Sequence, residues 1–141
     1  MRNEINNSEG YIDETPFLAM PSIEREERRL ERLARRPLVY ICSPYAGDVA
    51  GNTAAARRYS RFAAARGAIP VTPHLLYPQF MDDSDPAERA LALHFAQVLL
   101  DKCSEVWVFG DRVSEGMRGE IERAERRKRK IRHFDADMKE A

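Results

Sequence analysis

Short apolar runs recur along the chain and predict the strands of a sheet. The first, LVYIC at residues 38–42, is hydrophobic at every position and rich in β-forming residues. Such a run is too short for a helix and is typical of a strand buried on both faces of a parallel sheet. Similar runs predict strands at residues 68–71 and 105–109, and KIRHF at 130–134 is a possible last strand.

Apolar residues at helical spacing fill the stretches between these runs. They predict helices at residues 52–66, 86–101 and 115–127, with Gly67 ending the first of them. The resulting order is β-α-β-α-β-α-β. It predicts one α/β domain of Rossmann-like or flavodoxin-like type. We expect a parallel sheet of about four to five strands, with helices on both faces and right-handed crossovers.

The first part of the chain has a different pattern. Residues 1–21 are polar and show little periodicity, so we expect a flexible or partner-docked arm. Residues 22–36 predict a charged helix with Ser22 as its N-cap and a narrow apolar stripe. That stripe predicts a helix that packs against another surface, such as a second subunit. The α/β domain is then expected to span residues 37–141.

Composition narrows the class of protein. A chain of 141 residues with 43% hydrophobic residues fits one domain with a real core. Lys plus Arg and Asp plus Glu both number 23, and this balance argues against holding nucleic acid by charge. The basic run at residues 123–132 predicts a solvated helix face, with an anionic partner as the alternative. Cys42 and Cys103 are interpreted as reduced, buried thiols.

No segment predicts membrane insertion or secretion. The chain has no apolar run of about 18 residues or more, and its polar start lacks the apolar core of a secretion signal. We therefore expect a cytoplasmic protein without a membrane partner.

Two segments follow strands at the edge of the sheet where ligands bind in this architecture. Ligands of such sheets bind at the carboxyl ends of the strands, near the switch in strand order. Residues 43–51 follow the first strand, and residues 110–120 follow the third. The proline-punctuated loop at residues 72–86 also begins at this edge and carries His74, which is interpreted either as a pocket residue or as a structural one.

The sequence SEGMRGE at residues 114–120 carries the clearest chemistry. Ser114 is a natural N-cap, and Gly116 and Gly119 allow a ligand to approach the backbone. Free N–H groups in the first turn of a helix favour an anion or a polar sugar. Glu120 lies early in the same helix, where the dipole favours an ionised carboxylate. Such a carboxylate suits a nucleophile that attacks a sugar carbon.

Several segments, in this order, carry a family resemblance. They are VYICSPYAGD, an Asn at position 52, IPVTPHLLYPQFMDD, ALHFAQVLLDKCSEVWVFG and SEGMRGEIERA. Together they resemble the nucleoside 2-deoxyribosyltransferase-like superfamily over residues 38–134, most closely a branch of small bacterial and phage proteins. The S-x-G-x-x-x-E spacing is also similar to that of the deoxynucleoside 5′-monophosphate N-glycosidases.

The resemblance implies roles for individual residues. By position, Glu120 is the nucleophile, Ser114 contacts a 5′-phosphate, and Tyr40 lies near the sugar. Residues 43–47 form the floor around sugar and phosphate. Asn52 is expected to cap its helix first and to contact the ligand second, and Tyr45 either stacks on a base or packs within its loop. The expected substrate-binding residues are Ser43, Pro44, Tyr45, Gly47, Asn52, His74, Ser114, Gly116 and Met117.

Two positions depart from the family pattern. Ala46 stands where the N-glycosidases have an arginine that holds phosphate, which counts against a 5′-monophosphate substrate. Ser104 stands where the transferases often have an acidic residue.

The implied reaction is cleavage or transfer of the N-glycosidic bond of a (deoxy)nucleoside or nucleotide through a covalent glycosyl-enzyme. A general acid must protonate the leaving base. The candidates are Asp48, Asp82, Asp83 and Asp101, with Asp48 favoured because it lies in the first site loop.

Other expectations concern cofactors and partners. Because the cysteines and histidines lack metal-ligand spacing, we expect neither a metal nor an organic cofactor. The partners implied are a nucleoside or nucleotide and a second copy of the chain, as a homodimer or higher homo-oligomer. The alternative to an enzyme is a protein of a phage or mobile element that binds a nucleotide or nucleotide signal, as a sensor or sponge.

Overall fold

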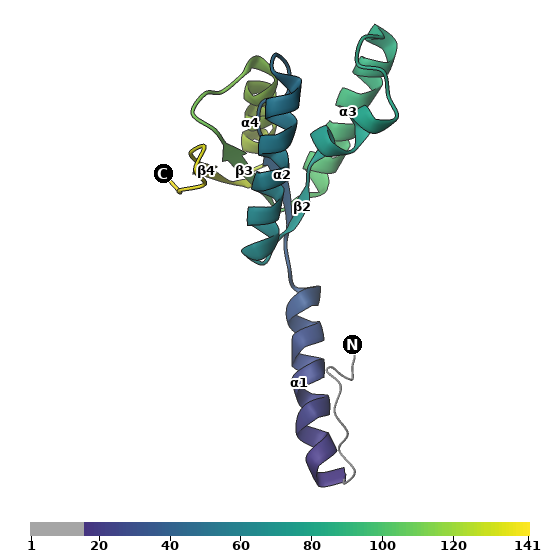
Figure 1. The fold of residues 1–141 in the computed structure, drawn as a ribbon, viewed down its shortest axis with the longest axis vertical. Coiled ribbons are helices and arrows are strands. Elements are labelled where there is room, and N and C mark those ends of the chain that lie inside the picture. Colours follow the sequence, from purple (N-terminus) through teal and green to yellow (C-terminus); the bar gives the residue numbers. More distant parts are fainter. Residues whose placement is uncertain (1–15) are drawn as a thin grey trace. The chain divides into compact units, whose positions relative to one another are not determined.

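The computed structural model describes residues 16–141, with side chains from residue 22 onward. The chain divides into two units, Met1–Arg36 and Pro37–Ala141, which are described separately. In the first unit, helix α1 spans Pro16–Ala34 (Figure 1). The sequence-based start at Ser22 is therefore wrong for this helix. A proline fits the first helical position because no N–H is needed there, so Pro16 is a suitable start. Residues 1–15 of the expected arm lie outside the described residues.

The second unit contains a four-stranded parallel sheet. Its order is β2-β1-β3-β4, and every neighbouring pair is parallel. This topology confirms the predicted α/β class, and it places the switch in strand order between β1 and β3. The strands are β1 (Leu38–Cys42), β2 (Ile69–Val71), β3 (Glu105–Phe109) and β4 (Lys130–Phe134).

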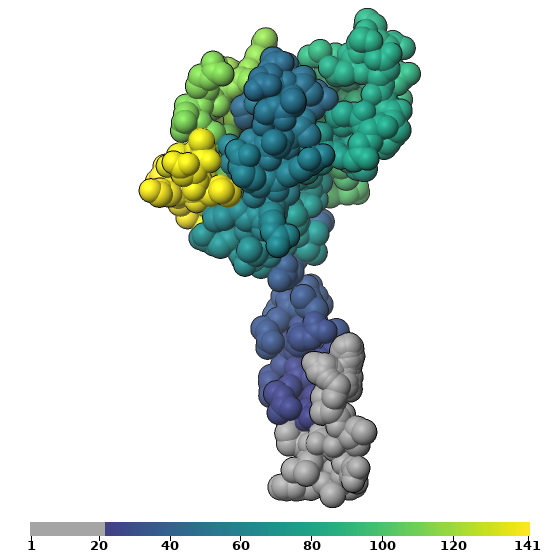
Figure 2. Space-filling view, in the orientation of Figure 1, coloured from purple at the N-terminus to yellow at the C-terminus, as the bar shows by residue number. Residues whose placement is uncertain are grey.

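Helices cover both faces of this sheet (Figure 1). Helix α2 packs on one face, where it covers the sheet in the space-filling view (Figure 2). Helices α3 and α4 pack on the other face. Two short 3-10 turns, η1 and η2, lie in the loop before α3. The bounds are α2 (Val49–Ala65), η1 (Pro73–Leu75), η2 (Tyr77–Gln79), α3 (Pro86–Lys102) and α4 (Glu115–Arg126). None of the described helices has the length and hydrophobicity needed to span a bilayer.

Alternate residues of β1 enter different cores, as the two-residue period of a strand requires. Val39 and Ile41 pack with the aromatic residues of α2, β3 and β4. Tyr40 and Cys42 pack on the opposite face, in a cluster that includes residues of α3 and α4. The face that carries Tyr40 is therefore the face covered by α4.

Helix α2 begins earlier than the sequence indicated. Asp48 is its N-cap, and its carboxylate accepts a hydrogen bond from the N–H of Gly51 (3.1 Å). The expectation that Asn52 caps this helix is wrong, because Asn52 already lies inside it. Asp and Asn are similarly good caps, so local sequence does not rank the two positions.

At the amino edge of the sheet, part of the basic run is paired with one carboxylate. Arg123 binds the Asp101 carboxylate through Nε and Nη2 (2.8 and 2.6 Å), and Arg127 approaches it to 3.1 Å. Arg129 donates to the Asp101 carbonyl (2.7 Å). These arginines bind the C-terminal end of α3, where the helix dipole favours positive charge.

We expect Asp101→Asn to lower the Tm by roughly 4 °C at neutral pH, because three arginines lose their counter-charge. The hydrogen bond from Arg123 lowers the pKa of Asp101. A lowered pKa stabilises the fold above the unfolded-state pKa, and this contribution is lost as the pH falls through the folded-state pKa. The difference between wild type and variant should therefore shrink in acid. Equal thermal unfolding at neutral pH would contradict this assignment.

Candidate functional site

The loops after β1 and β3 lie against each other at the carboxyl edge of the sheet. Gly110, at the end of β3, has φ +110°, and a Cβ placed there would lie 3.9 Å from Cδ of Pro44. Since β1 and β3 flank the switch in strand order, these loops occupy the position where ligands bind in open α/β sheets. The two segments singled out in the sequence are thus brought together.

Glu120 is the centre of the site. One carboxylate oxygen, Oε2, accepts a hydrogen bond from the Tyr40 hydroxyl (2.5 Å). The other, Oε1, lies 3.3 Å from the Cys42 thiol, which is placed to donate to it. Tyr40 and Cys42 are buried, whereas Glu120 is partly exposed. The carboxylate is therefore held from the strand side and remains within reach of a ligand.

Burial and hydrogen bonding shift the pKa of this carboxyl group in opposite directions. Burial raises the pKa of Glu120, while the hydrogen bonds from Tyr40 and Cys42 partly offset the rise. Burial, together with the nearby Glu120 carboxylate, raises the pKa of both Tyr40 and Cys42 well above their ordinary values. Both groups consequently stay protonated and donate to Glu120 over the whole physiological pH range.

Cys42 is the residue that sequence reasoning missed. It is a free, buried thiol, as the sequence indicated, but it also contacts Glu120. Tyr40 and Cys42 are two positions apart on one strand, so their side chains share a face. Once Tyr40 is placed beside Glu120, this spacing is the signal that would have added Cys42.

The start of α4 is built as the sequence predicted. Ser114 is the N-cap, and its hydroxyl accepts a hydrogen bond from the N–H of Met117 (3.3 Å). In return the Ser114 N–H lies 3.5 Å from the Met117 sulfur, and the Met117 side chain is buried. The remaining N–H groups of the first turn stay available for a ligand at this edge.

Gly116 leaves open space at the start of α4. A Cβ added there would meet no atom of the described chain within 4 Å. Gly116 lies four residues before Glu120, so the two positions share one helix face. Packing within the described chain therefore does not require a glycine at position 116, and the open space lies on the helix face that carries Glu120.

We expect Gly116→Ala to raise stability slightly, by up to about 1 kcal/mol, because alanine is the better helix former. The same change should raise KM for any ligand that occupies this space. Gly119→Ala is the comparison, since Gly119 is equally open but lies about 100° around the helix from Glu120. Thermal unfolding and steady-state kinetics measure the two effects. A loss of stability, or an unchanged KM, would contradict a ligand-facing position.

The loop after β1 is held by two residues expected to bind substrate. Asn52 Nδ2 donates to the carbonyls of Tyr45 (3.0 Å) and Ala46 (3.1 Å). The His74 ring stacks on Tyr45 at 4.9 Å, and His74 Nε2 lies 3.1 Å from the Ser43 carbonyl. Burial lowers the pKa of His74, so its ring is neutral at physiological pH. In this structure Asn52 and His74 position the loop.

Two further residues of this loop, Ser43 and Gly47, are among the expected substrate-binding residues. Ser43 is buried, and its hydroxyl has no hydrogen-bond partner within the part of the chain that the structure describes. Gly47 has φ +96° and no neighbouring atom near a Cβ position. A buried hydroxyl without a partner is costly, so Ser43 is a natural donor or acceptor for a bound molecule.

The four candidate acids have separate local partners. Asp48 caps α2, and Asp101 binds arginines at the opposite edge of the sheet. Asp82 accepts hydrogen bonds from the Ser84 N–H and hydroxyl. Asp83 is paired with Arg89 at 3.7 Å.

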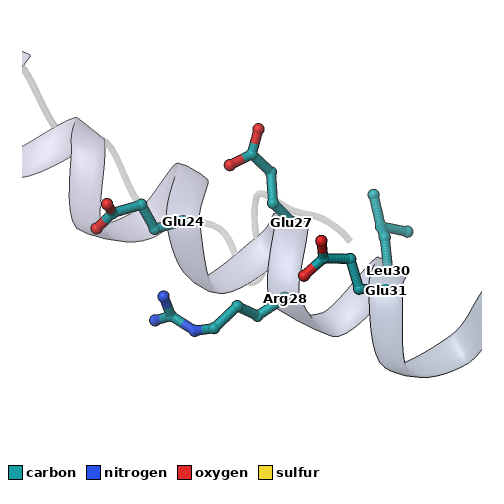
Figure 3. Close-up of a pocket in the computed structure, with 5 residues that line it drawn as sticks. All are labelled: Glu24, Glu27, Arg28, Leu30 and Glu31. Carbon is teal, nitrogen blue, oxygen red and sulfur yellow. The ribbon is translucent and has the colours of Figure 1, made fainter.

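The described residues contain no group of three or more His, Cys, Asp or Glu side chains that could hold a metal ion. A separate hollow lies on α1, lined by side chains of that helix alone (Figure 3). Its lining residues are Glu24, Glu27, Arg28, Leu30 and Glu31. One helix does not enclose a ligand, and we assign this hollow no role.

Comparison with known proteins agrees with this fold. The chain is similar in structure to the 2-deoxyribosyltransferase of the psychrotolerant bacterium Bacillus psychrosaccharolyticus, a biocatalyst for nucleoside synthesis, with a TM-score of 0.55 and 13% sequence identity. The likeness covers 70% of this chain and 72% of that chain, and it establishes a 2-deoxyribosyltransferase-like fold. The chain belongs to the family described as "Domain of unknown function (DUF7768)", which matches residues 37–134. No curated protein matches the chain.

Proposed function

We propose that this protein is an enzyme that cleaves or transfers the N-glycosidic bond of a (deoxy)nucleoside or nucleotide, with Glu120 as nucleophile. The observation that carries the proposal is the partly exposed Glu120 carboxylate, held by Tyr40 and Cys42 at the switch in strand order. The 2-deoxyribosyltransferase-like fold supports it. A carboxylate in this position would be an unfavourable choice for a site that only binds a sugar, since burial disfavours its charge.

In the proposed reaction, an oxygen of ionised Glu120 attacks the anomeric carbon of the sugar. The bond from that carbon to the base nitrogen breaks, and the base leaves with its electron pair and a proton from a general acid. The glycosyl ester on Glu120 is then opened by water or by a second base, which gives overall retention of configuration. Tyr40 and Cys42 act only on Glu120, by holding it ionised and oriented.

For the general acid we keep Asp48 as the first proposal. Its loop follows β1 directly, and Asp48 is exposed at the start of α2. The hydrogen bond from Gly51 uses only Oδ1. Asp83 is the second choice, because its charge acts on His74, which lies against the same loop.

The start of α4 is the proposed sugar and phosphate end of the site. Ser114 and the free N–H groups of the first helical turn suit a 5′-hydroxyl or a 5′-phosphate. Ser43 and Gly47 lie in the proposed floor. Tyr45, whose ring stacks on His74, is the proposed stacking partner for the base. A nucleoside and its 5′-monophosphate are both kept as candidate substrates, and Ala46 counts against the 5′-monophosphate.

We also propose that the protein is cytoplasmic and forms a homodimer or a higher homo-oligomer. The apolar stripe of α1, formed by Ile23, Leu30 and Leu33, is 56%, 53% and 40% exposed. Light scattering on purified protein tests the assembly, and a monomer over the whole concentration range would overturn it.

A substrate panel tests the proposed function. Each deoxyribonucleoside and each 5′-monophosphate is incubated with the protein, with and without a second free base, and base release or exchange is followed by chromatography. Turnover of one class of compound identifies the substrate class. Exchange of the base without net base release identifies a transferase. Binding without turnover would overturn the enzyme and favour the nucleotide-binding sensor or sponge.

A further inference from the structure

The Cys42 thiol is fully buried, yet it faces the partly exposed carboxylate of Glu120. Its sulfur has two acceptors nearby, Oε1 of Glu120 at 3.3 Å and the Met117 carbonyl at 3.9 Å. The carboxylate oxygen is the closer one and the one that carries charge. A thiol is a weak donor, and a charged acceptor strengthens its hydrogen bond.

The two donors on β1 each bind a different oxygen of the Glu120 carboxylate. Tyr40 holds Oε2, and Cys42 holds Oε1. One donor would leave the carboxylate free to rotate about its last side-chain bond, because that torsion is broad. Two donors from adjacent same-face positions of a rigid strand define its plane. Each carboxylate oxygen still keeps a second acceptor direction for chemistry.

We infer that Cys42 is a positioning residue for Glu120, which fixes the plane of the nucleophilic carboxylate through its Oε1 while Tyr40 holds Oε2. The inference rests on the proposed function for its catalytic meaning, but the contact itself can be tested without turnover. The titratable groups that act on Glu120 within the described chain are Tyr40 and Cys42. Cys103 lies close enough to act on Tyr40 and does not contact Glu120.

Cys103 supplies the matched control. Both thiols are buried in the same hydrophobic cluster, with exposures of 0% for Cys42 and 1% for Cys103. Replacing either by alanine removes the same atoms from that core. Only Cys42→Ala removes a donor to Glu120, so a difference between the two variants reports on the carboxylate and not on packing.

The contact is tested by infrared spectroscopy of the S–H stretch, with Cys42→Ala and Cys103→Ala assigning the two bands. We expect the Cys42 band at lower frequency than the Cys103 band, and a further step down as Glu120 ionises with rising pH. In Glu120→Gln that pH-dependent step should disappear. A Cys42 band that matches the Cys103 band and does not respond to pH would overturn the inference.

Steady-state kinetics test whether the hydrogen bond from Cys42 to Glu120 affects catalysis. We expect Cys42→Ala to lower kcat roughly fivefold with little change in KM, and to move the acidic limb of the pH profile upward, because one hydrogen bond to the ionised carboxylate is lost. Cys42→Ser keeps a donor and should recover most of the rate, whereas Cys103→Ala should behave as wild type. Equal kinetics for Cys42→Ala and wild type would overturn the positioning role. Absence of turnover in the wild type would overturn the proposed function instead, while the infrared result would still decide the contact.

Discussion

Replacing Glu120 by glutamine is expected to reduce base release or exchange by about a thousandfold or more, because the amide does not attack the anomeric carbon. Glutamine has nearly the same shape and still accepts a hydrogen bond from Tyr40, so the fold should be kept. Steady-state chromatographic assays on the substrate found by the panel measure the loss.

Glu122→Gln is the matched control for this variant. Glu122 lies two residues further along α4 and is exposed, so the same chemical change there should leave activity unaltered. A Glu120→Gln enzyme that keeps a tenth or so of the wild-type rate would be too active for the loss of a nucleophile.

Glu120→Gln should also be at least as stable as wild type at neutral pH. Burial raises the folded-state pKa of Glu120. A raised pKa in a carboxyl group stabilises the fold below the unfolded-state pKa, and this contribution is lost as the pH rises through the folded-state pKa. The neutral amide avoids that loss. A variant that gains stability but loses activity is expected when the original residue serves function at a cost in stability.

The second large effect is expected from Tyr40→Phe, which removes the hydroxyl that donates to Glu120 Oε2. A hydrogen bond to a charged group contributes about 1.5–3 kcal/mol, so kcat/KM should fall by roughly ten- to a hundredfold near neutral pH. Without this donor the pKa of Glu120 rises further, because the ionised form loses its partner. The acidic limb of the kcat/KM profile should therefore move to higher pH, and part of the lost rate should return in more alkaline buffer.

Tyr59→Phe provides the control for that change. Tyr59 is 4% exposed and stacks on Phe109 at 4.5 Å, on the opposite face of the sheet from Glu120. Removing its hydroxyl should leave the pH profile in place. A Tyr40→Phe enzyme with an unshifted acidic limb would contradict the account of how Glu120 is kept ionised.

The strands were the most predictable part of the fold. The bounds of β1 and β3 match the apolar runs, because a strand buried on both faces must be hydrophobic at nearly every position. The bounds of β4 match the stretch KIRHF, although only Phe134 of this strand is buried. Two helix starts were wrong, at α1 and α2. Each of these segments contains more than one residue that can begin a helix, so local sequence does not rank the possible starts. Ser114 was predictable because no competing cap stands beside it.

The geometry of the candidate site was predictable only where a local sequence pattern or the family resemblance indicates it. Glu120 and Ser114 share one short helix start, and Tyr40 comes from the resemblance. Cys42 was not found, because a cysteine in an apolar strand looks the same whether it packs in a core or faces a carboxylate. Its contact with Glu120 depends on how α4 packs against β1. No local sequence pattern in either segment determines that packing.

The measurement that tests the central claim most directly is covalent trapping of the glycosyl-enzyme. The protein is incubated with 2′-fluorinated analogues of the four deoxyribonucleosides, whose fluorine destabilises an oxocarbenium-like transition state and slows opening of the ester. Intact mass and peptide mapping then locate the label. The account predicts one fluorodeoxyribosyl group on the peptide that contains Glu120, absent in Glu120→Gln. Base release from natural substrate without any adduct at Glu120, or an adduct on another residue, would contradict it.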